Sequence, residues 1–430
     1  MVLLAILLAL YSGSLTAAQE AASPDPKQRA RAARELGRQS STVMPRLEAL
    51  LADPVLDVRL EAVKAIVNIG TQHSLAPLVA ATRDADPEIQ VRATDGLVNF
   101  FLPGYLQTGL SASVRRIGTS IKGRFTDTND QAIDPFIQVR AEIVEALGKL
   151  VRGASSLEAR ANAARAAGIL RARAAVPDLL EALRTKDDQV IYEVLIAVQK
   201  IRDPAAGPEI AFLLRDLNEK IQIAALETTG ILGNHGALPQ LREALERART
   251  PRIRRTALAA IAMLPDPANL PTYVRFLQDQ DADLRAAAAE GYARLKDPVH
   301  ASKIRQAFAD ERKMSPRLSL AFALVSLGSR EISELSPLQY LVNTLNSKAW
   351  RGVAQPFLVE LAREAPVRAQ LYTVLPRANR EEKTGLVFVL SRSGDQDTLA
   401  YLEPLSRDAD PEVAQEATRA LRVLQARLSP

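Results

Sequence analysis

Small apolar residues recur at helical spacing in residues 157–188, and most of the chain repeats this pattern. Ala163, Ala167 and Leu170 are three or four residues apart, which places them on one face of a helix. Pro177 can begin a second helix because its position needs no amide donor. The apolar stripe of that second helix consists of Val176, Leu179, Leu180 and Leu183. Neither helix could bury its stripe alone, so the pattern predicts one layer of a stack.

A start motif of Asp, often Pro, and then a Val-Arg pair recurs at a nearly constant period. It reads DPVLDVR at Arg59, DPEIQVR at Arg92 and DPFIQVR at Arg140. Degenerate versions include Ile191, Gln222, Arg254, Arg285 and Arg317. The step from Arg59 to Arg92 is 33 residues, and the later steps from Ile191 onward are 31, 32, 31 and 32. This period predicts an all-α superhelical solenoid of about a dozen helix pairs.

The Asp and Pro residues of the motif are helix-start signals, because the carboxylate accepts amide hydrogen bonds and Pro fits the first turn. We expect such starts at Asp53, Asp86, Asp134 and Asp410. Gly70, Gly233 and Gly328 follow predicted first helices, where a positive backbone angle is useful. The second helices are expected to open at Pro77, Pro177, Pro208, Pro239 and Pro271.

These motifs resemble the HEAT repeat family, in particular the short HEAT-like repeats named after phycobiliprotein lyases. The resemblance rests on the D-P-x-x-x-V-R start, the following A-x-x-A-L or A-x-x-x-L-G run, and the G-x-x-x-A-x-P-x-L turn, and it covers residues 26–428. It implies an α-α superhelix. It implies little about activity, because the family is mostly a scaffold shared by unrelated functions.

The period fails between residues 101 and 134. Arg92 and Arg140 are 48 residues apart, and the next comparable residue, Arg160, follows only 20 later. We therefore divide the chain into a leader with N-terminal repeats at 19–102, an insertion at 103–134, and a main array at 135–430 that becomes degenerate after about 330.

The insertion contains a predicted basic amphipathic helix at 109–125. Its apolar stripe consists of Leu110, Val114, Ile117, Ile121 and Phe125, and its basic residues are Arg115, Arg116, Lys122 and Arg124. Such a helix can contact an anionic membrane surface or an acidic partner. The alternative is that the stripe packs against the stack and the basic residues are simply solvated.

Residues 1–18 lack charged side chains and resemble a secretory signal peptide with cleavage after Ala18; an uncleaved anchor is the alternative. We therefore expect a periplasmic or secreted protein. The absence of cysteine excludes disulfides and thiolate metal sites. The net charge of +5 is a mild excess over 430 residues, so together with export it argues against nucleic-acid binding.

The residue types required for catalysis are sparse. The three histidines, His73, His235 and His300, fall in the turns of separate repeats, where they could not share one metal ion. A related HEAT-repeat family, the deoxyhypusine hydroxylases, binds iron through His-Glu pairs, but here Ser74, Gly236 and Ala301 follow the histidines. No nucleophile motif or phosphate loop is present. We expect no catalytic residues, metal site, cofactor or small-molecule substrate.

The predicted function is that of a non-catalytic scaffold that binds a protein partner through its concave face. If the second helices line that face, the positions one and four residues after each opening proline form a ladder of candidate contacts. This second-helix ladder comprises Asp178, Glu181, Glu209, Phe212, Gln240, Glu243, Thr272 and Arg275. The alternatives are a lyase-like protein that acts on a tetrapyrrole-bearing partner and a peripheral membrane binder that uses the 109–125 helix.

Overall fold

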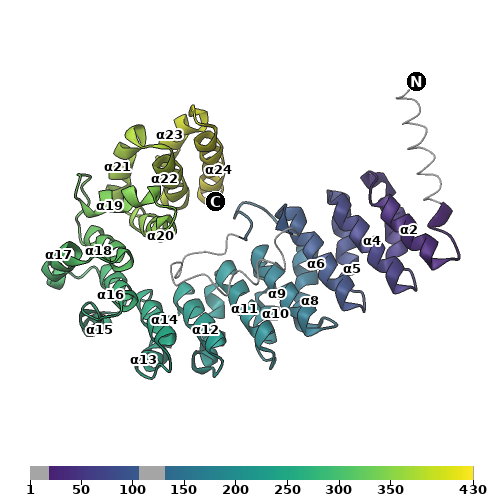
Figure 1. The fold of residues 1–430 in the computed structure, drawn as a ribbon, viewed down its shortest axis with the longest axis horizontal. Helices are drawn as coiled ribbons and strands as arrows, with labels where there is room; N and C mark the ends of the chain where they lie inside the picture. Colours follow the sequence, from purple (N-terminus) through teal and green to yellow (C-terminus); the bar gives the residue numbers. More distant parts are fainter. Residues whose placement is uncertain (1–18, 106–130, 430) are drawn as a thin grey trace. The chain divides into compact units, whose positions relative to one another are not determined.

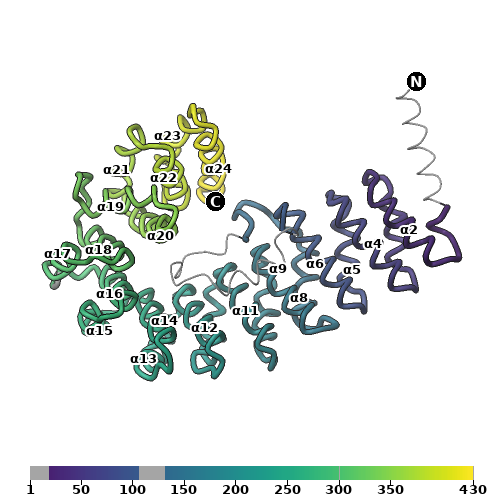
Figure 2. The backbone as a smooth tube through the Cα atoms, viewed as in Figure 1, coloured from purple at the N-terminus to yellow at the C-terminus, as the bar shows by residue number. Residues whose placement is uncertain are grey.

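The structure, a computed structural model, describes residues 19–105 and 131–429, and within these ranges it contains helices and no strand. The described residues form two compact units. Unit 1 holds residues 19–105, 131–133 and 137–203, and unit 2 holds residues 134–136 and 204–429. Figures 1 and 2 show that in each unit successive pairs of helices stack side by side.

Unit 1 contains two rows of helices. The first helices are α2 (Pro26–Leu36), α4 (Leu56–Ile69), α6 (Pro87–Phe101), α9 (Leu157–Ile169) and α11 (Asp188–Ile201). The second helices are α3 (Met44–Leu51), α5 (Leu75–Ala81), α8 (Ala141–Gly153) and α10 (Val176–Ala182). Short 3-10 turns, η1 (Ser41–Val43), η2 (Gln72–Ser74) and η5 (Arg173–Ala175), precede three of the second helices.

Unit 2 continues the same alternation after η6 (Pro204–Ala206) and η7 (Pro208–Arg215). Its first helices are α12 (Glu219–Ile231), α14 (Pro251–Ala262), α16 (Ala282–Leu295), α18 (Met314–Ser326), α20 (Arg351–Leu361), α22 (Arg380–Ser393) and α24 (Pro411–Leu428). Its second helices are α13 (Leu238–Glu246), α15 (Leu270–Phe276), α17 (Ala301–Asp310), α19 (Pro337–Asn343), α21 (Ala365–Val374) and α23 (Thr398–Leu402). The remaining turns are η8 (His235–Ala237), η9 (Pro267–Asn269), η10 (Pro298–His300), η11 (Thr344–Asn346), η12 (Leu375–Arg377) and η13 (Pro404–Arg407).

Alanine allows neighbouring first helices to approach closely. Helix α9 packs between α6 and α11, and it buries almost its whole surface through Ala161, Ala163, Ala166 and Ala167. A Cβ atom at Gly168 would lie only 2.6 Å from the Cα atom of Ala197 on α11. The interface of α9 with its neighbours is therefore built from small side chains. The predicted all-α stack of helix pairs is confirmed.

Several local predictions are confirmed. The carboxylate of Asp86 accepts hydrogen bonds from the amides of Glu88 and Ile89 at the start of α6, and Asp410 does the same at the start of α24. Gly70, Gly233 and Gly328 have φ angles of 55°, 70° and 111°. Arg171, Arg202 and Lys296 adopt comparable left-handed angles after α9, α11 and α16, so glycine is not required at this turn.

The prediction of a helix start at Asp134 is wrong. Residues 135–140 are not helical, and α8 begins only at Ala141. Helix α8 is a second helix rather than a first one, because it packs beside α10 while α6 contacts α9 directly. The insertion therefore lies inside one repeat, between its first and second helices. Asp134 instead accepts hydrogen bonds from the Arg419 guanidinium of unit 2.

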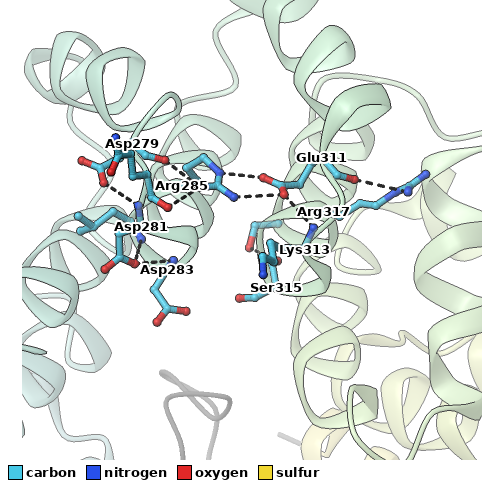
Figure 3. Close-up of polar contacts among 11 residues, drawn as sticks. Asp279, Asp281, Asp283, Arg285, Glu311, Lys313, Ser315 and Arg317 are labelled. Carbon is cyan, nitrogen blue, oxygen red and sulfur yellow. Dashed lines mark hydrogen bonds and ion pairs between the residues drawn. The ribbon is translucent and has the colours of Figure 1, made fainter. Parts of the chain in front are cut away.

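Two arginines of the start-motif series, Arg59 and Arg285, link successive repeats, whereas Arg92 pairs with Glu88 on its own helix. Arg59 donates to the carboxylate of Asp84 at 2.8 and 3.2 Å and to the carbonyl oxygen of Asp53 at 3.0 Å. Arg285 donates to the carboxylate of Glu311 at 2.8 and 3.2 Å in the same way (Figure 3). Each guanidinium thus holds the loop before its own helix and the loop of the next repeat. We call this series of contacts the arginine ladder.

The two rows of unit 2 lie on different sides of an arc. In Figure 1 the first helices lie on the inner side; these are α14, α16, α18, α20, α22 and α24. The second helices lie on the outer side; these are α13, α15, α17, α19, α21 and α23. The expectation that second helices line the inner face is therefore wrong for unit 2. The buried alanines explain the arrangement, because thin first helices such as α16 can crowd on the inside of a bend.

Candidate partner-binding surfaces

The first members of the predicted second-helix ladder lie on α10. Asp178 is half-buried and its carboxylate is 2.9 Å from the Arg152 guanidinium at the end of α8. Glu181 is exposed one turn later. Both residues point away from the buried stripe, as predicted, but Asp178 already joins two neighbouring second helices.

The next members flank an irregular element. Glu209 and Phe212 lie in η7, which is a 3-10 helix over eight residues instead of the expected α-helix. Phe212 is 61% exposed, which is unusual for a large apolar side chain. On α13, Glu243 pairs with Arg215 of η7, and Gln240 is half-buried.

The last members lie on α15. Thr272 is half-buried, and the exposed Arg275 pairs with Glu246 of α13 at 2.8 Å. The guanidinium of Arg275 also lies over the Phe276 ring, 4.5 Å from its centroid. Glu243 on α13 and Arg275 on α15 therefore form ion pairs with the preceding element of the second row, η7 and α13 respectively. Exposed pairs of this kind contribute about 0–1 kcal/mol, so they leave this surface available for contact.

Other predicted features have different outcomes. Arg115, Arg116, Lys122 and Arg124 lie outside the described residues, as does the 1–18 segment. The histidines lie in the turns η2, η8 and η10 of separate repeats, as the sequence predicts. Within the described ranges, no group of three or more histidine, aspartate or glutamate residues is placed to hold a metal ion. No described helix is long and apolar enough to span a membrane.

A groove on the first helices α20, α22 and α24 was not predicted. It has a volume of about 880 Å³, and all its lining residues belong to unit 2. Helix α20 contributes Arg351 and Gln355, and α22 contributes Thr384 and Phe388. Helix α24 contributes Gln415, Glu416, Thr418, Arg419 and Arg422, and Asp134 and Phe136 are also part of the lining. We call this surface the first-helix groove.

The groove combines an aromatic platform with polar side chains. The Arg392 guanidinium lies 3.6 Å from the centroid of the Phe388 ring, which is half-buried in the groove. Burial raises the pKa of Glu416, and the nearby Arg419 only partly opposes this shift. Arg351 donates to the carbonyl oxygen of Leu345 at 2.7 Å and pairs with Glu381. The lining therefore combines charged side chains of both signs with amide, hydroxyl and aromatic groups.

Sequence reasoning missed this groove because its residues lie where the period is degenerate. Gln355, Thr384 and Gln415 are ordinary polar residues of first helices, and no motif marks them. The only available signal was their position outside the buried stripes of three successive first helices. That signal becomes informative only after the first helices are known to lie on the inner side.

The comparisons with known proteins agree with the repeat architecture. The family model described as HEAT repeats matches residues 15–97 and 238–325, and these two stretches are HEAT repeats. Among curated proteins, none matches the sequence significantly.

Three of the similar solved structures are the following. The complex of CpcE and CpcF of phycocyanin lyase from Nostoc sp. PCC7120 is 20% identical, with 60% of this chain and 90% of that chain covered and a TM-score of 0.35. Importin beta is 15% identical, with 97% and 63% covered and a TM-score of 0.40. A structure from work on the interaction between cadherin and beta-catenin is 13% identical, with 97% of both chains covered and a TM-score of 0.41.

Proposed function

We propose that this stack of HEAT repeats is a non-catalytic scaffold and that its first-helix groove binds an extended segment of a protein partner. The observation that carries the proposal is a groove lined by the same row of three successive repeats. Neighbouring helices lie about 8–10 Å apart, and an extended chain advances about 3.3 Å per residue, so each repeat would meet about three residues of the partner.

The side chains of the groove suit the backbone of such a segment. The amides of Gln355 and Gln415 can each donate and accept hydrogen bonds, and Thr384 can do both through its hydroxyl group. Phe388 offers an aromatic surface for one apolar side chain of the partner. Recognition would therefore combine backbone hydrogen bonds with one apolar anchor.

Capture of partners from a native envelope extract tests this function. The triple variant Gln355→Ala, Thr384→Ala and Gln415→Ala should lose the principal captured protein. The matched control replaces Glu181, Gln240 and Thr272 of the second-helix ladder by alanine, and it should retain that protein. The reverse result would move the binding surface to the second helices and overturn the groove proposal.

Export to the periplasm or the cell exterior is part of the proposal, because the apolar, uncharged segment at 1–18 is typical of a secretory signal. Cell fractionation with a C-terminal tag tests it, and a tagged protein found only in the cytoplasm would contradict it. The tetrapyrrole alternative requires a purified protein with a visible absorption band. The membrane alternative requires liposome binding that falls when Arg115, Arg116, Lys122 and Arg124 are replaced by alanine.

A further inference from the structure

One carboxylate of the first-helix groove accepts no hydrogen bond within the described ranges. It belongs to Glu416 on α24, which lines the groove beside Gln415 and Arg419. Its one ion contact there is long, 4.0 Å from Oε2 to Nη1 of Arg419. Carboxylate oxygens that are partly buried usually accept at least one hydrogen bond. The groove therefore contains an acceptor that the rest of the chain leaves unused.

The surroundings make the ionised form of this carboxylate costly. The Glu416 side chain is only 28% exposed, and burial raises its pKa above the ordinary value for glutamate. The charges of Arg419 and Arg392 favour the ionised form, but burial outweighs them, and the like charge of Asp134 adds to the cost. A cation brought to the carboxylate from outside the chain would offset this cost.

Arg419 does not satisfy Glu416, because its guanidinium already holds another acid. It donates to both oxygen atoms of the Asp134 carboxylate, at 2.8 and 3.1 Å. Arg351, on the α20 side of the groove, pairs with Glu381. These two arginines of the lining are matched by acids, whereas Glu416 lacks a close basic partner.

An apolar surface lies near this carboxylate. The Arg392 guanidinium is 3.6 Å from the ring centroid of Phe388, and its charge also acts on Glu416, so the ring and the carboxylate flank the same group. Phe388 is half-buried on α22, which packs against α24. Long basic side chains place their aliphatic stems on apolar surfaces and keep their charged ends with polar groups. A lysine or arginine side chain therefore matches both parts of the site.

We propose that Glu416 binds the positively charged group of a lysine or arginine on the protein partner, while the aliphatic stem of that side chain lies on Phe388. The groove, with a volume of about 880 Å³, is large enough to admit such a side chain together with its backbone. The inference rests on the proposed partner-binding function and adds the chemistry of one contact.

Carboxyl NMR of the full chain tests the proposal. The Cδ signals of glutamate are recorded on ¹³C-labelled protein, and the signal of Glu416 is assigned by its loss in Glu416→Gln. The probe is the peptide N-acetyl-Phe-Ser-Lys-Ser-amide, and its matched control carries Nε-acetyl-lysine, which keeps the stem and removes the charge. The control variant is Glu403→Gln, which changes an exposed carboxylate of the last repeat outside the groove.

The lysine peptide should shift the Glu416 signal to saturation, and the acetyl-lysine peptide should not. In Glu416→Gln, affinity for the lysine peptide should fall about tenfold or more, because a charge-assisted hydrogen bond is lost, whereas Glu403→Gln should keep the affinity. The melting temperature of Glu416→Gln should be unchanged or higher, because no internal hydrogen bond is lost and the burial of a charge is relieved. A purely structural role for Glu416 would lower it.

A Glu416 signal that does not respond to the lysine peptide would overturn the proposal. An equal response to the acetyl-lysine peptide would also overturn it, because a neutral donor would then suffice. A failure here is distinguishable from a failure of the proposed function. If the triple groove variant loses the captured protein while Glu416→Gln retains it, groove binding stands and only the basic contact is removed. Retention by the triple variant contradicts the proposed function itself.

Discussion

The two units connect their first helices through buried charges in different ways. In unit 1, Arg165 of α9 donates to the Glu193 carboxylate of the adjacent helix α11 at 2.8 and 3.2 Å. In unit 2, Arg294 of α16 donates to the carboxylate of Glu360 at 2.9 Å, and Glu360 lies on α20, two first helices away. The same kind of ion pair therefore spans one repeat boundary in unit 1 and two in unit 2.

The difference shows how one side chain can tighten a repeat stack. Arg294 also donates to the carbonyl oxygen of Ala262 on α14 at 3.2 Å and lies 5.3 Å from the Phe322 ring centroid on α18. From α16 it thus contacts three other first helices, α14, α18 and α20, and α18 is buried from Leu318 to Val325. In unit 2, Arg294 adds polar contacts that reach from α14 to α20, whereas the α9 to α11 boundary of unit 1 combines alanine packing with one ion pair.

The largest effect is expected at the pair in unit 1. Glu193→Ala should lower the free energy of local unfolding of α9 and α11 by about 3–5 kcal/mol, because it leaves the Arg165 guanidinium buried without a carboxylate partner. Glu193 is 3% exposed, so water cannot replace the carboxylate. Native-state hydrogen exchange of α9 and α11 measures the loss.

The control for this prediction is Glu145→Ala, which removes an exposed pair with Lys149 and should cost about 0–1 kcal/mol. Equal effects of the two substitutions would show that the buried pair contributes nothing special to unit 1.

The next effect is expected at the bend of unit 2. Arg294→Met should destabilise the α16 to α20 region by about 2–3 kcal/mol, less than in unit 1 because the Glu360 side chain is 36% exposed and can be hydrated. It should also lengthen and broaden the distance between spin labels at residues 282 and 352. Arg275→Met, which removes an exposed pair on the outer row, should leave that distance unchanged. An unchanged distance in Arg294→Met would show that the bend does not depend on this residue.

A smaller effect is expected where α9 meets α11 through glycine. Gly168→Ala should destabilise unit 1 by about 1–3 kcal/mol, because the new methyl group would lie 2.6 Å from backbone on α11. Gly153→Ala, at the end of α8 with nothing within 4 Å, should be neutral or slightly stabilising. Thermal unfolding of the two variants compares them, and an equal melting temperature would contradict the close approach of α9 and α11.

The smallest effects concern pH, and two aspartates of unit 1 should act in opposite directions. The hydrogen bond from Arg29 lowers the pKa of Asp53, whereas burial raises the pKa of Asp95. Asp53 therefore stabilises the fold above its unfolded pKa of about 3.9, and this contribution disappears as the pH falls through its lower folded pKa. Ionised Asp95 is penalised above its folded pKa, so protonation in acid relieves that cost.

Urea unfolding between pH 7 and pH 2.5 separates these contributions. At pH 7, Asp53→Asn should cost about 1–2 kcal/mol and Asp95→Asn should cost nothing or stabilise by up to about 1 kcal/mol. The deficit of Asp53→Asn should shrink as the wild-type carboxylate becomes protonated. A deficit that stays constant down to pH 2.5 would contradict the assigned direction for Asp53.

The repeat architecture could be read from the sequence because its signals are local. The period of the start motif, the caps at Asp86 and Asp410, and the turn at Gly70 each depend on residues close in the chain. The match to HEAT repeats at 15–97 and 238–325 confirms the resemblance that these motifs carry. Local chemistry therefore predicts helices and their pairing.

The place of the insertion could not be read in the same way. DPFIQVR copies the start motif, yet Asp134 caps no helix and α8 begins at Ala141. The motif does not fix a helix start by itself: at Asp53 it precedes the first helix α4, which begins only at Leu56 without a side-chain cap, and at Asp134 it precedes α8, which occupies a second-helix position. Counting repeats from the motif therefore placed one boundary incorrectly.

The candidate site depends on contacts between residues that are far apart in the sequence, and no local motif marks such contacts. Arg294 and Glu360 are 66 residues apart, and Asn162 and Asp95 are 67 apart, but only the first pair skips a first helix. Sequence separation cannot distinguish the two cases, because the insertion lengthens one repeat. The first-helix groove likewise brings together residues of α20, α22 and α24 that lie far apart in the sequence.

Site-specific photocrosslinking tests the proposed binding surface most directly. A photoreactive phenylalanine analogue is placed at Gln355 or Gln415 in the first-helix groove, and at Gln240 or Glu181 in the second-helix ladder, and cells expressing each variant are irradiated. Groove positions should each crosslink to the same partner protein, and ladder positions should not. Crosslinks from the ladder positions alone would contradict the account.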